Sequence, residues 1–208
     1  EGDRVRGWHP RLCLHTGDKR PFETIVTSVN NNTAELTLVT DYTNTRNALW
    51  GVMARNREQN FAMNLLTDPL VDLVTLLGTA GTGKTLLALA AGLAQTLDQK
   101  LYREIVVTRV TVPVAEDIGF LPGTEEEKMA PWMGALMDNL EVLTESDDSH
   151  NDWNRAAAND LLSSRIKIRS PNFMRGRTFL NRYLIIDEAQ NLTSKQLKTL
   201  LTRAGPGT

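Results

Sequence analysis

The sequence contains a glycine-rich stretch, Gly78-Thr79-Ala80-Gly81-Thr82-Gly83-Lys84-Thr85. A glycine, four further residues and then Gly-Lys-Thr form the pattern of a phosphate-binding loop, provided that a strand precedes it and a helix follows. Both flanks meet that condition, because residues 73–77 are a short apolar run and residues 86–97 are rich in alanine and leucine. The loop therefore predicts a nucleotide site between a strand and a helix.

The residue types in this loop match the chemistry of a magnesium-bound triphosphate. Glycines allow successive backbone N–H groups to converge on phosphate oxygens, and the following helix presents its positive end to the same charge. Lys84 is expected to reach the β- and γ-phosphates, and the Thr85 hydroxyl is expected to coordinate Mg²⁺. ATP and Mg²⁺ are the predicted cofactors. The competing interpretation is a glycine-rich turn in which Lys84 is accidental.

A pair of carboxylates follows a second apolar run, residues 183–186. Asp187 is expected to hold the hydration shell of Mg²⁺, and Glu188 to accept a proton from the attacking water. Gln190 is a candidate contact to the γ-phosphate or to that water, although a solvated polar residue fits the sequence nearly as well. The alternative for the two acids is that they merely favour the start of the next helix electrostatically.

The order of the expected elements predicts an α/β fold. Short apolar runs at 73–77, 105–108 and 183–186 alternate with helix-forming segments at 86–97 and 194–203. Strands that alternate with helices form a mostly parallel sheet with helices on both faces. Ligands bind beyond the carboxyl ends of such strands, where the glycine loop and the two acids are expected.

A smaller β-rich region precedes this pattern. Residues 22–29 and 33–40 have strand character and are separated by three asparagines, which predicts a β-hairpin. Ala34, Leu36 and Leu38 alternate with polar neighbours over part of the second strand. This alternation predicts that the three side chains form a buried face of the hairpin.

The composition is that of a globular protein, with 208 residues, 41% hydrophobic residues and a net charge of -2. We expect a β-rich appendage in residues 1–50 and a nucleotide-binding domain in residues 51–208. The longest apolar run, residues 86–94, is about half of what a membrane-spanning helix needs. The single cysteine, Cys13, fits a reducing compartment. These features predict a cytoplasmic protein with no membrane partner.

Several motifs together resemble the PhoH family. They are the phosphate loop, the Asp-Glu-Ala-Gln strand end, and residues 117–123 and 173–178. Three residues after the Gly-Phe-Leu-Pro-Gly motif add to the likeness: Lys128, Pro131 and Trp132. The resemblance covers residues 54–208 and implies a P-loop ATPase with a RecA-like sheet, related to superfamily 1 helicases, with RNA as its polymer.

The resemblance also implies an adenine contact and further partners. A helix is expected over residues 57–66 with Asn56 as its cap. Gln59 in this helix would read adenine, because its amide both donates and accepts; a glutamine on the helix surface is the competing interpretation. A homo-oligomeric ring is also expected, as is a PIN-type ribonuclease domain upstream in a longer chain.

Residues 163–182 form a basic stretch, with six basic residues and no acidic one. Arg175 and Arg177, together with Arg109, are candidate contacts to single-stranded RNA. Two aromatic residues in the stretch are expected to stack on unpaired bases: Phe173 and Phe179. The alternatives are a solvated face with core aromatics, or Arg175 and Arg177 acting on the nucleotide of a neighbouring subunit.

These features predict Mg²⁺-dependent ATP hydrolysis coupled to the binding or remodelling of RNA. The first alternative is a nucleotide-binding regulatory module with little turnover, and a P-loop kinase is the less favoured one. The chain departs from the family at its end, because relatives continue beyond Thr208 into a strand with a further γ-phosphate sensor and an arginine-bearing segment. The C-terminal part of the core is therefore expected to be missing.

This departure generates a prediction for the 208 residues expressed alone. We expect them to fold poorly or to hydrolyse ATP weakly, because the missing strand would leave backbone groups at the sheet centre without partners. Thermal unfolding and a phosphate-release assay test this expectation. A cooperative transition together with steady turnover would contradict it.

Overall fold

The computed structural model describes residues 7–17, 22–109, 164–169 and 178–208. The chain divides into two compact units. The first consists of Glu1–Ala48 and Met53–Leu77, and the second of Leu49–Val52 and Gly78–Thr208. Several predicted features lie outside the described residues: the motif at 117–123, Lys128, Pro131, Trp132, Phe173, Arg175 and Arg177. The predicted division at residue 50 stays a prediction.

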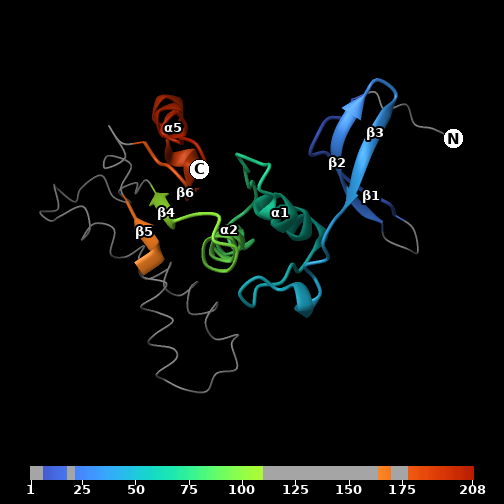
Figure 1. Ribbon diagram of the computed structural model, residues 1–208, viewed down its shortest axis with the longest axis horizontal. Coiled ribbons are helices and arrows are strands. Elements are labelled where there is room, and N and C mark those ends of the chain that lie inside the picture. Colours follow the sequence, from blue (N-terminus) through green and yellow to red (C-terminus); the bar gives the residue numbers. More distant parts are fainter. Residues whose placement is uncertain (1–6, 18–21, 110–163, 170–177) are drawn as a thin grey trace, which may run out of the picture. The chain divides into compact units, whose positions relative to one another are not determined.

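The first unit contains a three-stranded antiparallel sheet of order β1-β2-β3. Its strands are β1 (Cys13–His15), β2 (Glu23–Asn30) and β3 (Thr33–Leu38), of which β2 and β3 form the predicted hairpin (Figure 1). Asn31, in the turn, has a φ of 42°. Asparagine tolerates this left-handed conformation better than most residues, and the sequence therefore supplies the right residue for the turn.

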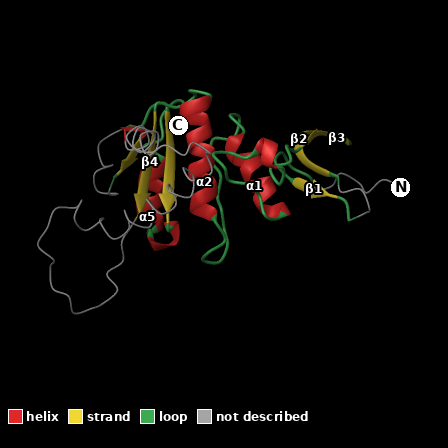
Figure 2. Ribbon diagram, turned by 90° about the horizontal axis from the view of Figure 1, so that it is seen from below, coloured by secondary structure: helices red, strands yellow, loops and turns green. Residues whose placement is uncertain are grey.

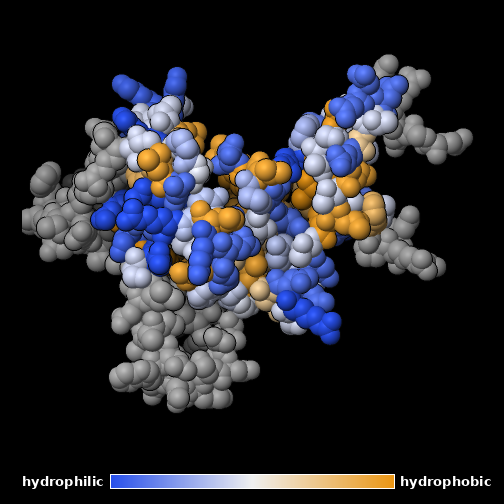
Figure 3. Space-filling view, in the orientation of Figure 1, coloured by the Kyte–Doolittle hydropathy of each residue, from blue (hydrophilic) through white to orange (hydrophobic). Residues whose placement is uncertain are grey.

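The buried side of this sheet differs from the prediction. The predicted buried face on β3 is wrong, because Leu36 and Leu38 are exposed, and apolar side chains show on the surface of this sheet (Figure 3). Ile25 and Val26 of β2 are buried instead. The physical reason is position: β2 lies between two strands, whereas β3 is an edge strand bonded to β2 alone.

Helix α1 (Arg57–Thr67) confirms the helix predicted for this region, and a short 3-10 turn, η1 (Thr45–Asn47), precedes it. Asn56 caps α1 as predicted, because its side chain accepts the backbone N–H of Gln59 at 2.8 Å. Asn60, buried on the inner face of α1, accepts the backbone N–H of Tyr42 at 2.9 Å. This bond fixes the loop after β3 to the helix.

The second unit is built on a parallel sheet of order β5-β4-β6. Strand β4 (Glu104–Arg109) lies between β5 (Ile166–Ile168) and β6 (Arg182–Asp187). The strands β4 and β6 match the apolar runs predicted from the sequence. Strand β5 was not predicted, because it lies inside the basic stretch and has only two isoleucines between basic residues.

Helices cover both faces of this sheet, as predicted. Helix α2 (Lys84–Leu93) continues into a π-helical turn, η2 (Ala94–Asp98), and α5 (Ser194–Leu201) follows β6 after the 3-10 turn η3 (Ala189–Asn191). Figures 1 and 2 show α2 and α5 flanking the strands. The chain thus forms the α/β arrangement that the order of its elements predicts.

Side-chain contacts assign each helix to its face. A Cβ placed on Gly92 of α2 would lie 2.8 Å from the ring of Tyr183, so this helix packs closely on β6. Burial raises the pKa of the Tyr183 hydroxyl. On the other side, Leu200 of α5 packs with Val106 and Leu184. Successive residues of a strand point to opposite faces, so Tyr183 and Leu184 face different helices.

The strand predicted at residues 73–77 is absent from the described structure. Leu77 is 99% exposed and Leu73 is also exposed. The described residues contain no strand paired with this segment. An apolar run becomes a strand through hydrogen bonds to a neighbour, and such a neighbour is not encoded in the run itself. The prediction of a strand before the phosphate loop is therefore wrong for this structure.

The packing of α5 yields a matched pair of stability variants. Leu200 is 3% exposed and its chain neighbour Leu201 is 37% exposed. We expect Leu200→Ala to lower the free energy of unfolding by about 2–5 kcal/mol, because it opens a cavity against Val106. Leu201→Ala should cost less than about 1 kcal/mol. Urea titration of both variants measures the difference, and equal losses would contradict the packing described for this helix.

Candidate functional site

Two glycines of the loop adopt a left-handed backbone conformation. Gly81 and Gly83 have φ angles of 77° and 78°, in the left-handed region that a side chain disfavours. The Thr82 hydroxyl donates to the carbonyl of Thr79 at 2.8 Å and braces the turn from inside. The glycines at these positions are therefore required by the curl of the loop.

Helix α2 begins directly at this loop. Gly83 is its N-cap and no side chain caps the helix, whose ten residues leave their first N–H groups facing the loop. The positive end of the helix dipole adds to these donors. Lys84 donates from Nζ to the carbonyl oxygens of Gly78 and Thr79 at 2.9 and 2.8 Å. The loop thus holds an ammonium group beside uncapped N–H donors, which suits an anion such as a triphosphate.

The two residues predicted to bind magnesium, Thr85 and Asp187, are hydrogen-bonded to each other. The Thr85 hydroxyl, in the first turn of α2, donates to Oδ1 of Asp187, at the end of β6, at 3.1 Å. Mg²⁺ takes oxygen ligands and is typically bound by one or two protein groups together with phosphates and water. The pair fits that requirement. Among the described residues no cluster of three or more histidine, cysteine, aspartate or glutamate side chains offers a fuller metal cage.

The second acid lies one residue beyond Asp187. Glu188 has a φ of 50°, a left-handed conformation that is uncommon for a residue with a side chain. This turn ends the strand and directs the chain into η3. The side chain of Glu188 is 39% exposed, so its carboxylate reaches water, and the Gln190 amide donates to it. Gln190 therefore contacts the candidate base directly.

Arg109 completes the cluster at the carboxyl edge of the sheet. Its guanidinium lies 3.6 Å from Asp187 and 3.9 Å from Glu188. The register of β4 and β6 explains this proximity, because Arg109 is the partner of Asp187. The predicted contact of Arg109 with RNA stays a prediction.

Comparison with known proteins gives a match that includes the phosphate loop and the acidic strand end. The family described as PhoH-like protein matches residues 51–208. This chain belongs to the PhoH family. PhoH2 of Bacillus subtilis is 47% identical over 161 residues, and PhoH2 of Mycolicibacterium smegmatis is 39% identical over 161 residues. The PhoH-like protein of B. subtilis is 39% identical over 136 residues.

The matches cover most of this chain and a smaller part of the relatives. The two PhoH2 alignments cover 76% of the chain and the PhoH-like alignment covers 65%. The chain spans 35% of the length of each PhoH2 protein and 40% of that PhoH-like protein. The PhoH family has a P-loop NTPase fold, which agrees with the loop, helix and parallel sheet of the second unit. Within the described ranges, every helix is too short or too polar to cross a membrane.

Gln59, the residue expected to read adenine, has a structural role in this PhoH chain. Its side-chain oxygen accepts the backbone N–H of Arg55 at 2.7 Å, at the start of α1. Its own backbone N–H donates to Asn56. The bond to Arg55 uses one of the two lone pairs of the oxygen that adenine recognition would also use. The adenine contact of Gln59 stays a prediction.

Three described residues of the basic stretch make contacts within the protein. Arg182 pairs with Glu104 at 2.6 Å, and Arg165 donates to the carbonyl of Arg103 at 3.0 Å. Phe179 is buried with Val106. The expectation that Phe179 stacks on RNA bases is therefore wrong, and the core alternative holds for this residue.

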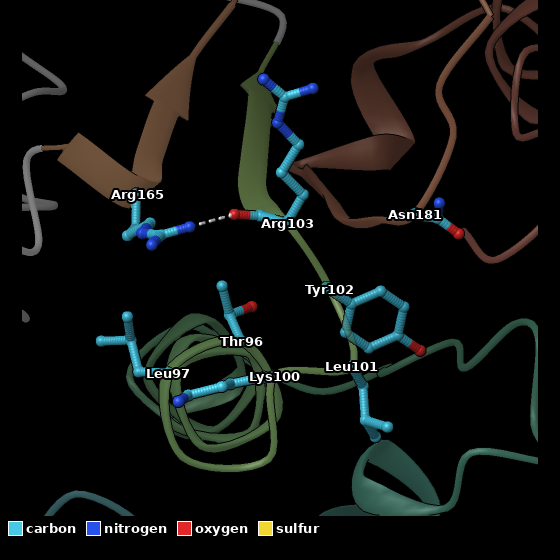
Figure 4. Close-up of a pocket in the computed structure, with 8 residues that line it drawn as sticks. All are labelled: Thr96, Leu97, Lys100, Leu101, Tyr102, Arg103, Arg165 and Asn181. Carbon is cyan, nitrogen blue, oxygen red and sulfur yellow. Dashed lines mark hydrogen bonds between the residues drawn. The ribbon is translucent and has the colours of Figure 1, made fainter.

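A separate hollow of about 560 Å³ lies at the opposite ends of the strands. Arg103, Arg165 and Asn181 line it, and each precedes the first residue of a strand (Figure 4). In Figure 4 the Arg103 guanidinium and the Lys100 ammonium lie in opposite parts of the view, so these two cations do not converge. The described lining of this hollow includes neither acid at the end of β6.

The loop conformation generates a prediction. We expect Gly83→Ala to lower the free energy of unfolding by about 1–2 kcal/mol, because alanine is strained in the left-handed region. Gly17→Ala is the control, because Gly17 has open space around it and no left-handed φ. Urea unfolding of both variants tests the expectation. Equal stability of the two would show that the loop adopts another conformation in solution.

Proposed function

We propose that this PhoH-family chain binds ATP with Mg²⁺ and hydrolyses it, and that hydrolysis drives the binding or remodelling of RNA. The observation that carries the proposal is the hydrogen bond between Thr85 and Asp187. It joins the phosphate loop to the acidic strand end, the two parts that a hydrolysing P-loop site needs together. The RNA component is supported by the family resemblance.

Each residue of the site has a distinct task in this proposal. Mg²⁺, when bound, would neutralise charge on the phosphates. Thr85 would coordinate it through its hydroxyl oxygen, and Asp187 would hold its hydration shell. Lys84 would exchange the loop carbonyls for phosphate oxygens, which offer its ammonium group stronger, charged acceptors. Glu188 would take a proton from water, while Gln190 orients the Glu188 carboxylate.

A nucleotide-binding regulatory module is the second candidate, and one observation favours it. Two side chains contact the Glu188 carboxylate: Arg109 forms an ion pair with it, and Gln190 donates a hydrogen bond to it. A carboxylate with two partners already in place has fewer open positions for an attacking water. Such a site would bind ATP firmly and turn over slowly.

The whole protein's properties extend this proposal. We include a homo-oligomeric ring, a PIN-type ribonuclease domain upstream and a cytoplasmic location. Arg175 and Arg177 would contact RNA or the nucleotide of a neighbouring subunit. These points rest on the family resemblance. The chain spans 35% of the length of its PhoH2 relatives, so they concern a longer protein.

Two variants separate binding from hydrolysis. Lys84→Ala should weaken ATP binding, because the loop loses its positive charge. Glu188→Gln should still bind ATP, with turnover lower by about 10²-fold or more, because the amide cannot accept the proton. Calorimetry with ATP and a phosphate-release assay measure the two effects. Equal turnover in wild type and Glu188→Gln would remove Glu188 from the mechanism.

The same assays distinguish the candidate functions. Turnover that rises when single-stranded RNA is added supports the proposed function, because hydrolysis is then coupled to the polymer. Tight ATP binding with negligible turnover, with or without RNA, supports the regulatory module. Phosphate transfer to an added nucleoside or metabolite would support the kinase and overturn the proposal.

A further inference from the structure

One guanidinium reaches both acids of the candidate site. Arg109 and Asp187 are the last residues of β4 and β6 and are paired in register. Nη1 of Arg109 lies 3.6 Å from Oδ2 of Asp187, and Nη2 lies 3.9 Å from Oε1 of Glu188. A single cation therefore spans the proposed magnesium ligand and the proposed base.

Both carboxylate oxygens of Asp187 are engaged. Oδ1 accepts the Thr85 hydroxyl at 3.1 Å, and Oδ2 faces Arg109. The Asp187 side chain is 15% exposed, so solvent screens its charge only partly. A metal ion that approaches Oδ2 meets the guanidinium there. Like charges repel most strongly where solvent is excluded, so Mg²⁺ and Arg109 cannot share this oxygen at low cost.

The contacts of Arg109 with the two acids are long for charged hydrogen bonds. Such bonds are typically about 2.7–2.9 Å from nitrogen to oxygen. Arg182 and Glu104, at the amino ends of the same two strands, provide a direct comparison, because their nitrogen and oxygen atoms are 2.6 Å apart. The pairs of Arg109 with the two acids are thus held by charge rather than by tight hydrogen-bond geometry. A divalent ion can displace a partner of this kind.

We propose that Arg109 competes with Mg²⁺ for Asp187 and acts as a positioning residue for Glu188. Before nucleotide binds, the guanidinium neutralises both acids. With Mg²⁺ and its hydration shell at Oδ2 of Asp187, Arg109 would leave that oxygen and keep its contact with Glu188, which it would hold in place. The inference rests on the proposed function, since it needs nucleotide and Mg²⁺ to bind at this edge.

For Arg109→Gln the proposal predicts that nucleotide binding needs less Mg²⁺ while turnover becomes slower. Without the competing cation, the Mg²⁺ concentration that gives half-maximal nucleotide binding should fall by about fivefold or more. Turnover at saturating Mg²⁺ should also fall, because Glu188 loses the charge that positions it. A merely structural role would weaken both binding and turnover. Arg109→Lys keeps the positive charge and should retain a Mg²⁺ requirement close to that of the wild type.

The experiment is a titration of the protein with a fluorescent, non-hydrolysable ATP analogue over a series of Mg²⁺ concentrations. Arg182→Gln is the matched control, because it removes an arginine–glutamate pair between the same strands at their other end. It should leave the Mg²⁺ requirement unchanged. Thermal unfolding of each variant shows whether the fold is retained, and Arg109→Ala, which also removes the charge, carries the test if Arg109→Gln does not fold.

The outcomes separate this inference from the proposed function. A lower Mg²⁺ requirement in Arg109→Gln, with Arg182→Gln unchanged, supports the competition. An unchanged or higher requirement in a folded Arg109→Gln overturns it while nucleotide binding itself stands. A large change in the Mg²⁺ requirement of a folded Arg109→Lys also overturns it. Failure of the wild type to bind the analogue at any Mg²⁺ concentration overturns the proposed function and this inference together.

Discussion

The parallel pairing of β4 with β6 is the constraint on which the candidate site depends. Six residue pairs in register run from Glu104 and Arg182 at one end to Arg109 and Asp187 at the other. Because side chains alternate along each strand, this register also decides which residues meet α2 and which meet α5. A shift of one residue would exchange the two faces and move Asp187 away from Thr85. The geometry of the acids is therefore a property of the sheet.

Left-handed backbone conformations occur both in the phosphate loop and at the acidic end of β6. Gly81 and Gly83 are left-handed in the phosphate loop, and Glu188 is left-handed at the end of β6. Glycine adopts this conformation at little steric cost, whereas a glutamate does so only where the surroundings hold it. At Glu188 the surroundings include Gln190 and Arg109. The loop is thus shaped by its composition, and the acidic turn by its neighbours.

Charge is arranged with opposite consequences at the two edges of this sheet. At the amino edge, Arg182 and Glu104 form a close pair that joins β4 to β6. At the carboxyl edge, the guanidinium of Arg109 faces two carboxylates at longer range. The close pair joins the two strands, whereas the cation shared by two acids is the arrangement on which the proposed competition with Mg²⁺ rests. The same residue types therefore serve different purposes at the two ends of the same strands.

Much of this arrangement could be predicted from the residues in order along the chain. The phosphate loop, the Asn56 cap, the hairpin, the strands that became β4 and β6, and the helices that became α2 and α5 are encoded by local patterns of glycine, capping residues and apolar periodicity. The predicted pairing of Thr85 and Asp187 as magnesium residues also followed from knowing which edge of a parallel sheet binds ligands. Local patterns suffice here because the conformation of a turn or a cap depends on its own few residues.

Contacts between distant segments decided the rest. The apolar run at 73–77 lacks a strand partner, Phe179 enters the core, β5 forms inside a basic stretch, and Leu38 stays exposed on an edge strand. The link from Arg109 to both acids likewise depends on the register of two strands separated by more than seventy residues. Hydrogen-bond partners, burial and ion pairs of this kind are supplied by other parts of the chain, so they exist only once the tertiary structure has formed.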